Sequence, residues 1–323
     1  MYHEAMDIKE EKINYKDGSH FEARLCRVRH IKPHYHNHDL ELIFCISGRI
    51  RLVAGHQHIT INAGEIFSVD YRDIHFTYSD RDNITLFLHL DLTKARIPRE
   101  RLKCVFFACE SSHCFPYQQE AMKNVKDLLL SLAYVSFANI KNEEASDTEH
   151  IYDQLLKILI KYFDWYNYEN RDAYMNSDLR DRFYRILAYC NENFTEKLSI
   201  SQIAESEHLS EKYIPQFFSK TVFHNFNNMI QYIRCYEAEH LLLTTDMSNS
   251  DISFACGFSD PKYFYMLFKK WWLCTPSEHR ARYRKYMEKP PENSVISRKE
   301  SEAIIKDEIT NWHLKKASSL TIS

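Results

Sequence analysis

Three alternate histidines and a glutamate form a dense set of side chains that could bind a ligand. His34, His36 and His38 share one face if their segment is extended, and Glu41 follows closely. His75, after a later turn, can join them. Imidazole nitrogens and carboxylate oxygens bind transition metals and form hydrogen bonds with small polar molecules. We predict that His36, His38, Glu41 and His75 line a ligand site.

A second pattern lies at residues 247–280, where two short helices are predicted around a tight turn. Gly257 stands where the first helix must end, because glycine readily takes the left-handed conformation that ends helices. Asp260 then caps a second helix that has Pro261 at its first position. A short helix, a turn and a second helix with a polar, cationic outer face are typical of a helix-turn-helix unit.

The same pattern occurs about fifty residues earlier. Ser199 and Gln202 form a capping box before the first copy. A helix-capping residue also follows each copy, Asn225 in the first and Thr275 in the second. The amphipathic segment FNNMIQYIRCYEAEHLLLTT joins the copies as one long helix. A repeat at a fixed period is stronger support for two such units than either copy alone.

The outward side chains of the two second helices are expected to contact DNA ~34 Å apart, on one face of the duplex. Gln216 can read adenine with two hydrogen bonds, Lys212 and Lys262 can reach guanine acceptors, and Met266 can only pack on a thymine methyl. Free N–H groups at helix starts suit phosphate. The residues predicted to bind DNA are Lys212, Gln216, Lys220, Lys262, Tyr265, Met266, Asn225, Thr275 and Arg280.

With these motifs, residues 180–284 resemble the DNA-binding domain of the AraC/XylS family of transcription regulators. The segments that carry the resemblance are IRCYEAEHLLL, DISFACGFSDPKYFYMLFKK and TPSEHR. The resemblance implies two helix-turn-helix units, a linking helix and one recognition helix per unit in the major groove. It also implies a cytoplasmic homodimer that binds promoter DNA, senses a small-molecule effector and, if the protein is an activator, contacts RNA polymerase.

Three features depart from the family pattern. Phe223 and Leu273 replace the glycine that usually follows each recognition helix. Pro215 is expected about five residues into the first recognition helix, where it would remove a hydrogen bond and strain the preceding turn. Residues 176–288 contain 14 lysines and arginines against 14 aspartates and glutamates. We therefore expect modest intrinsic DNA affinity, increased by dimerisation.

Residues 20–92 predict short strands, since apolar and polar residues alternate and Gly48, Gly55 and Gly64 mark the corners. Strands at roughly ten-residue spacing favour a small antiparallel barrel. The segment from the histidines to His75 resembles the cupin domain found at the N-terminus of many AraC-type regulators. Metal-dependent cupins use two histidines, a glutamate and a later histidine. We expect no tightly bound metal here, because the spacing from His36 to Glu41 is one residue longer than that pattern.

Two apolar helices are predicted at residues 118–168, from the stripes Met122, Val125, Leu129 and Leu132, and then Leu155, Ile158 and Tyr162. They can cover the barrel, form a dimer interface, or do both, and we predict a dimer.

In residues 290–323 a helix with Ile305, Ile309 and Trp312 on one side is expected to dock on its own protein. The predicted domains are 1–112 (cupin-like barrel), 113–168 (helical dimerisation region), 169–178 (linker), 179–289 (double helix-turn-helix) and 290–323 (tail).

Length, charge and composition exclude several other classes of protein. The chain has 323 residues, enough for two domains with cores. Its net charge of −3 does not suit a nonspecific nucleic-acid binder. The 9 cysteines are unpatterned, and no apolar run suits a signal peptide or a membrane span.

The predicted fold is an α+β multidomain chain with an N-terminal antiparallel cupin-like barrel and a C-terminal all-α double helix-turn-helix. The predicted function is that of a transcription regulator with a small-molecule sensor, no cofactor and no enzymatic activity. Two alternatives stay open. One is a metal-dependent cupin enzyme with a helical appendage, and the other is a DNA-binding regulator whose barrel binds a protein partner.

Overall fold

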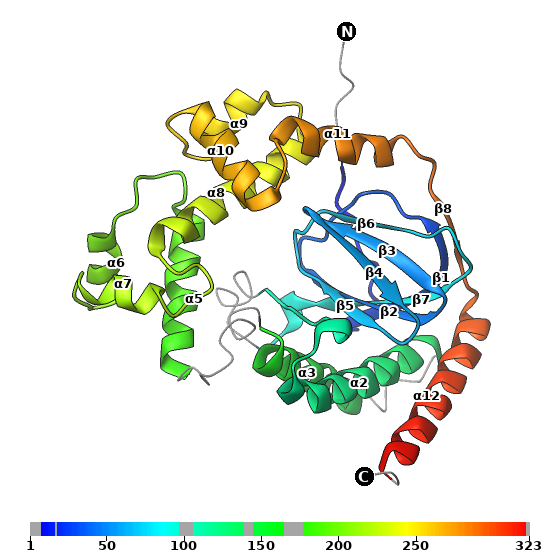
Figure 1. Cartoon of the computed structure of the whole chain (residues 1–323). Coiled ribbons are helices and arrows are strands. Elements are labelled where there is room, and N and C mark those ends of the chain that lie inside the picture. The colour runs from blue at the N-terminus through cyan, green and yellow to red at the C-terminus, as the bar shows by residue number, and fades with distance from the viewer. Residues whose placement is uncertain (1–7, 17, 97–105, 139–144, 165–176, 321–323) are drawn as a thin grey trace.

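A computed structural model describes residues 8–16, 18–96, 106–138, 145–164 and 177–320 of the chain. An antiparallel β-barrel is followed by two helices that lie against it, then by a helical region, and finally by a tail that returns to the barrel (Figure 1). This arrangement confirms the predicted fold class. The predicted linker at 169–178 lies largely outside the described residues, and the proposed domain boundaries stay predictions.

The barrel is nearly closed and all its strand pairs are antiparallel. Along the sheet the strands follow the order β4-β3-β6-β1-β7-β2-β5, and β8 pairs with β1 outside this path. The strands are β1 (Phe21–His30), β2 (Asp39–Ser47), β3 (Arg49–Ala54), β4 (Gln57–Asn62), β5 (Ile66–Val69), β6 (His75–Tyr78), β7 (Ile84–Asp91) and β8 (Glu292–Val295). The alternating segments were predicted as strands, whereas β6 and β8 were not.

Alternation along each strand separates two environments. In β2, Leu40 and Leu42 belong to the apolar core shared with the helices, whereas Ile43 packs in a second core inside the barrel. Glu41 is on the inner side with Ile43 and is only 3% exposed. The period-2 pattern therefore gives the barrel an apolar outer face toward the helices and an interior that contains a buried carboxylate.

The helices α2 (Gln119–Ala138) and α3 (Ala145–Tyr162) pack on each other, and α2 packs on β1. Short 3-10 turns precede them at Leu92–Lys94, Ser111–His113 and Pro116–Gln118. Val125, Leu129 and Leu155 are fully buried within the chain. The apolar stripes from which a dimer was predicted are thus satisfied by intramolecular packing.

Seven helices lie between residues 177 and 287 of the described chain, as the sequence predicted. Ser199 and Thr275 form capping boxes, and Asn225 and Asp260 accept hydrogen bonds from backbone N–H groups of the helices that they begin. The helices are α5 (Ser177–Glu192), α6 (Ile200–Ser206), α7 (Tyr213–Phe218), α8 (Phe226–Thr244), α9 (Asn249–Ala255), α10 (Pro261–Trp272) and α11 (Pro276–Met287).

One expectation about the recognition helices needs correction. Pro215 is the third residue of α7, so its missing N–H falls in the first turn, where backbone N–H groups have no intrahelical partner. The expected loss of a hydrogen bond deep in the helix was wrong. Leu273 ends α10 by taking the left-handed conformation itself, with φ of 58°. In the first unit the positive φ falls on His224.

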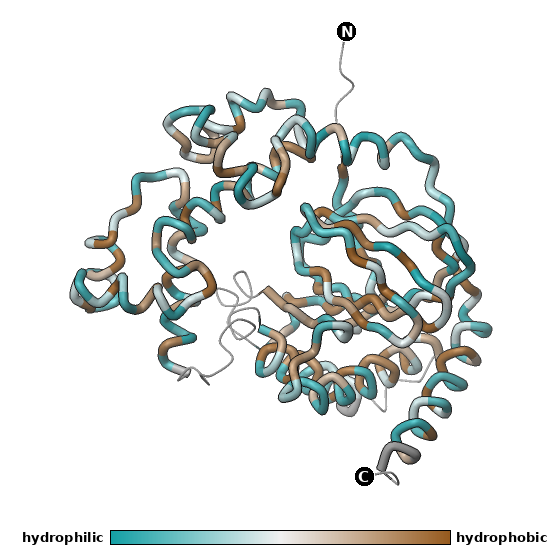
Figure 2. Tube along the Cα trace, in the orientation of Figure 1, coloured by the Kyte–Doolittle hydropathy of each residue, from teal (hydrophilic) through white to brown (hydrophobic). Residues whose placement is uncertain are grey.

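The tail crosses back over the barrel. Strand β8 pairs with β1, and α12 (Arg298–Leu320) then packs on α2. Ile305 is fully buried, and Ile309 and Trp312 pack against the same core, so the predicted docking helix is confirmed. The stretch between α11 and α12 is mostly hydrophilic in Figure 2. Its attachment therefore depends on backbone pairing, on the buried side chain of Ile296 and on the docked helix.

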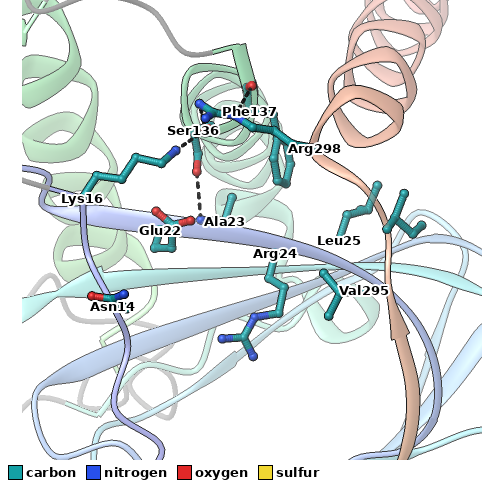
Figure 3. A pocket seen from close by; sticks show the side chains of 11 residues that line it. Asn14, Lys16, Glu22, Ala23, Arg24, Leu25, Ser136, Phe137, Val295 and Arg298 are labelled. Atoms are coloured by element: carbon teal, nitrogen blue, oxygen red, sulfur yellow. Dashed lines mark hydrogen bonds between the residues drawn. The ribbon is translucent and has the colours of Figure 1, made fainter.

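Polar contacts at the end of α2 secure the tail. Arg298 donates hydrogen bonds to the carbonyls of Phe137 and Ser136, at 2.7 and 3.2 Å. Lys16, from the N-terminal segment, donates to the same Ser136 carbonyl at 2.6 Å (Figure 3). Both cations satisfy carbonyl groups that a helix leaves open at its C-terminus. They border a cavity of about 360 Å³ between β1, α2 and the tail.

Among the described residues, no helix is long and apolar enough to cross a membrane.

Candidate functional site

The barrel interior brings together four of the side chains considered from the sequence. One ligand atom from each of His34, His36, Glu41 and His75 lies within 4.8 Å of the others. His36, Glu41 and His75 are each at most 3% exposed. The Nε2 atom of His75 is 2.9 Å from Glu41 Oε2. A buried carboxylate therefore faces converging imidazoles at the centre of the barrel.

The backbone fixes how three of these rings are oriented. The Nδ1 atoms of His34, His36 and His75 lie 2.8, 3.0 and 2.9 Å from the carbonyl oxygens of Lys32, Glu11 and Asp73. A carbonyl oxygen only accepts hydrogen bonds, so each Nδ1 must carry the proton. In the neutral ring this leaves the Nε2 lone pair free, and for His36 and His75 this atom faces the cluster.

Burial and neighbouring charges set the protonation of the cluster. Burial lowers the pKa of His34 to about 4 and that of His36 to about 3, so both rings are neutral at pH 7. Burial by itself would raise the pKa of Glu41, but His75 and His89 hold this pKa well below its usual value. Burial opposes a proton on His75, yet the adjacent Glu41 carboxylate raises the pKa of His75.

The structure changes the membership of the predicted ligand site. His38 is exposed, so it does not line the interior with His36. Two other residues take part that the sequence did not suggest. His89 lies 3.2 Å from Glu41 Oε1, and Glu11 lies 3.2 Å from His34 Nε2. His89 is directly opposite Glu41 in the pairing of β2 with β7, which explains its position.

The donor set suits a transition metal. Three imidazole nitrogens and one carboxylate oxygen are ligands that Zn²⁺ and neighbouring ions accept. Ring N–H groups bonded to backbone carbonyls are the usual support for such ligands. His34, His36, Glu41 and His75 are therefore the residues that could hold an ion. The expectation of no tightly bound metal is not tested by the structure.

The second candidate site is the outer face of the helical region. Lys212, Gln216 and Lys220 are exposed on or beside α7, as are Lys262 and Met266 on α10. Met266 is 58% exposed, which is high for an apolar side chain. These side chains lie where the sequence predicted them, on the second helix of each unit. Their contacts with DNA stay a prediction.

Two of the predicted DNA contacts have structural roles here. The Tyr265 hydroxyl accepts a hydrogen bond from Asn249 at 2.8 Å, so this half-buried ring is held against α9. Arg280 donates to the carbonyls of Leu242 and Met247 at 2.9 and 2.8 Å. Arg280 therefore closes the end of α8, and the position does not favour its predicted role in contacting DNA.

The two units are held together at a second place besides the linking helix α8. Arg234, on α8, donates to the carbonyls of Phe194 and Glu196 at 2.8 Å each, just before the first unit. Gly257, in the turn of the second unit, lies so near Thr195 that an added Cβ would be 2.8 Å from its backbone. The relative placement of α7 and α10 is thus fixed by close packing.

Comparison with known proteins agrees with this geometry. A family profile described as a helix-turn-helix domain matches residues 203–282. An uncharacterized HTH-type transcriptional regulator of Staphylococcus aureus (strain COL) is 23% identical over 75% of this chain, which spans only 31% of that relative. The HTH-type regulator YdiP of Escherichia coli (strain K12) is 23% identical over 78% of this chain and 81% of its own length.

A solved structure of ToxT from Vibrio cholerae aligns with a TM-score of 0.42 and 16% identity, covering 81% of this chain and 98% of that one. The profile match and the helix pairs define the C-terminal region as a helix-turn-helix DNA-binding domain. This domain is of the AraC type, and the resemblance to AraC/XylS regulators is confirmed.

Proposed function

We propose that this protein is a sequence-specific DNA-binding transcription regulator whose barrel controls how α7 and α10 are presented to DNA. The observation that carries the proposal is the pair of helix-turn-helix units with exposed polar residues on both second helices. A small-molecule effector in the barrel and RNA polymerase, if the protein is an activator, are the partners that follow from it.

Direct contact between barrel and helical region supports control by the barrel. Arg72 forms two hydrogen bonds with the Glu237 carboxylate on α8, at 2.7 and 2.8 Å. The next residue, Asp73, accepts a hydrogen bond from Tyr236 at 2.9 Å. Bidentate arginine–carboxylate pairs are geometrically specific as well as strong. A change in the loop before β6 would therefore act directly on the linking helix.

A second contact joins the barrel to the last helix of the second unit. The Tyr283 hydroxyl on α11 donates to the Ile74 carbonyl at 3.0 Å. Tyr286 lies against Phe76, with the ring centroids 4.1 Å apart. Tyr283 is fully buried. The barrel thus contacts both the linking helix and α11, which lies directly after α10.

The direct test is to map the DNA that the full-length protein binds across the genome of its source organism. We expect discrete sites of shared sequence, lost in a Gln216→Ala/Lys262→Ala double variant. Lys94→Ala is the matched control, since Lys94 is an exposed lysine in the short turn after β7, away from the recognition helices and outside α3. Binding without sequence preference, or equal loss in the control, would reject the proposal. The genes beside the sites would indicate the effector class.

Homodimerisation remains part of the proposal. The helices α2 and α3 bury their apolar stripes, and α12 covers part of α2, so an interface there must use the polar outer face of α3 or displace α12. The exposed residues of that face are His150, Gln154, Lys157 and Lys161. A monomer by light scattering at micromolar concentration would count against a dimer.

The enzyme alternative predicts something different. A metal-dependent cupin enzyme would turn over a small substrate and would not select DNA sequences. The relatives matched by sequence are named transcriptional regulators, which favours the regulator.

A further inference from the structure

We propose that His34, His36, Glu41 and His75 bind a divalent first-row transition-metal ion, and that this ion is the effector to which the helix-turn-helix domain responds. The first half of this proposal, the ion site, stands on the barrel alone. The second half rests on the proposed function and names the effector class. It replaces the expectation of no tightly bound metal, which the spacing from His36 to Glu41 had motivated.

The buried atoms of the cluster lack hydrogen-bond partners of their own. His36 Nε2, Glu41 Oε2, His75 Nε2 and His89 Nε2 are all inaccessible to solvent and none forms a hydrogen bond of acceptable geometry. The approach of His75 to Glu41 at 2.9 Å is an ion-pair distance without hydrogen-bond alignment. Buried polar atoms without partners cost free energy. A cation at the point where they converge would satisfy several of them at once.

The cluster geometry is close to what an ion requires. Tetrahedral ligands about 2.1 Å from zinc lie ~3.4 Å from each other. The four ligand atoms are already within 4.8 Å of one another, so a small inward movement is enough. A cavity of about 80 Å³ adjoins His34, Glu41, His75 and His89. This space leaves room for the ion and one further small ligand.

The type of donor decides the type of ion. Imidazole nitrogens favour zinc, iron, cobalt, nickel and copper over calcium and magnesium, which prefer oxygen ligands. The Nδ1 atoms of His34, His36 and His75 are already bonded to backbone carbonyls, so the rings need no change of tautomer. Glu41 supplies the negative charge, and His89 faces its other oxygen at 3.2 Å.

The same two segments supply both the ion ligands and the contacts with the helical region. Between His34 and His36 lies Tyr35, whose ring packs on His240 of α8, with centroids 4.8 Å apart. On either side of His75 lie Ile74 and Phe76, which contact Tyr283 and Tyr286 of α11. Alternation along an extended chain turns neighbouring side chains to opposite faces. Movement of the ligands toward an ion therefore moves the residues on which α8 and α11 rest.

The test of the site uses the full chain, stripped with a chelator and titrated with Zn²⁺ and, for its visible spectrum, Co²⁺. We expect one ion per chain and a tetrahedral Co²⁺ spectrum, with affinity reduced at least about 100-fold in Glu41→Gln. His38→Ala is the matched control, because His38 is exposed two residues from His36. If Glu41→Gln does not fold, judged by circular dichroism, His34→Ala at the rim replaces it. No saturable binding, or equal binding by the variant and wild type, would overturn the site.

The test of the response is amide hydrogen exchange with and without Zn²⁺. We expect the ion to slow exchange in residues 72–78, α8 and α11. In Arg72→Ala, which loses the Glu237 pair but keeps every ligand, the ion should bind with similar affinity and should protect α8 less, while the protection of α11, which contacts Ile74 and Phe76, is kept. Binding without any change in α8 and α11 would overturn the role as effector. DNA selection by the stripped protein is measured separately, so failure of the proposed function is distinguishable from failure of the site.

Discussion

The two helix-turn-helix units have the same order of helices, but they differ in helix length and in the residues that cap and end their helices. The recognition helix α10 has twelve residues, Asp260 as a cap and Pro261 at its first position. Its counterpart α7 has six residues, and Lys212, the residue before its first turn, provides no side-chain cap. The first helix of each unit ends differently too, with His208 in the left-handed conformation in the first and Gly257 in the second. The second unit is the better supported by local sequence, whereas the first depends more on packing around it.

This contrast suggests unequal roles in DNA binding. The first unit presents Gln216, which has directional hydrogen bonds to offer, on a short helix. The second presents Lys262 and Met266 on a longer, capped helix, and its Tyr265 hydroxyl already bonds Asn249. We therefore expect the first unit to discriminate between bases and the second to anchor the protein.

The largest expected effect comes from replacing Gly257, the left-handed glycine in the turn between α9 and α10. Gly257→Ala should lower the free energy of unfolding by about 3 kcal/mol, because φ is +77° and the new Cβ would meet the Thr195 backbone at 2.8 Å. Urea unfolding measures it. The matched change His208→Gly should instead be neutral or slightly stabilising. Equal losses in both variants would show that the two turns do not differ.

The next effect concerns DNA. Gln216→Ala should weaken binding to the preferred site by about 1–3 kcal/mol and relax the preference at one base pair. Lys262→Ala should weaken binding to all DNA sequences alike, and it should lower by about one the slope with which the logarithm of the binding constant falls with the logarithm of the salt concentration. Binding titrations on variant sites at several salt concentrations separate these outcomes. If Lys262→Ala changed the preferred base and Gln216→Ala did not, the roles would be reversed.

A pH dependence is expected in the second unit alone. His279 is fully buried, and its Nε2 lies 2.7 Å from Glu239 Oε1. Burial opposes its charge, but Cys274 and Glu239 raise the pKa of His279 to about 8. Its stabilising contribution, about 2 kcal/mol, is therefore complete below pH ~6.5 and is lost as the pH rises through about 8. The equivalent position of the first unit holds the apolar Met229.

Urea unfolding at pH 6 and pH 9 tests this prediction. Wild type should lose stability at the higher pH, and His279→Gln should lose much less. The same loss in the variant would assign the pH dependence to another group.

The smallest effect is a gain. Leu273 is 72% exposed and has φ of 58°, so it keeps the strain of the left-handed conformation and buries little. Leu273→Gly should raise the free energy of unfolding by about 1 kcal/mol. His224→Gly, at the positive-φ residue of the first unit, should give a similar gain. Thermal unfolding detects both changes, and a loss of stability in either would show that its side chain contributes contacts.

Local patterns predicted most of the elements. Alternation identified the long strands, and caps with apolar spacing identified the seven helices and the docking of Ile305. Strand β8 could not be found in this way, because all four of its residues are exposed and backbone pairing with β1 holds it. Its sequence carries no period that reports a buried face.

The candidate site was only partly predictable for a similar reason. Spacing identified His36, Glu41 and His75, but also His38, which the turn before β2 leaves exposed. His89 joins because β7 pairs with β2 in a register that no local pattern specifies. A signal did exist: His89 interrupts an apolar strand on the same face as Phe87, which is inside the barrel.

The return of the tail to β1 has a consequence for how the chain is made. During synthesis the partner of Cys26 in this pairing, Val295, leaves the ribosome only after both helix-turn-helix units have emerged. Until then one stretch of β1 keeps an unpaired edge, and such edges are sites of aggregation in nascent chains. Closing contacts of such long sequence separation is slow. The first strands of the barrel are therefore translated well before the strand that completes the pairing of β1.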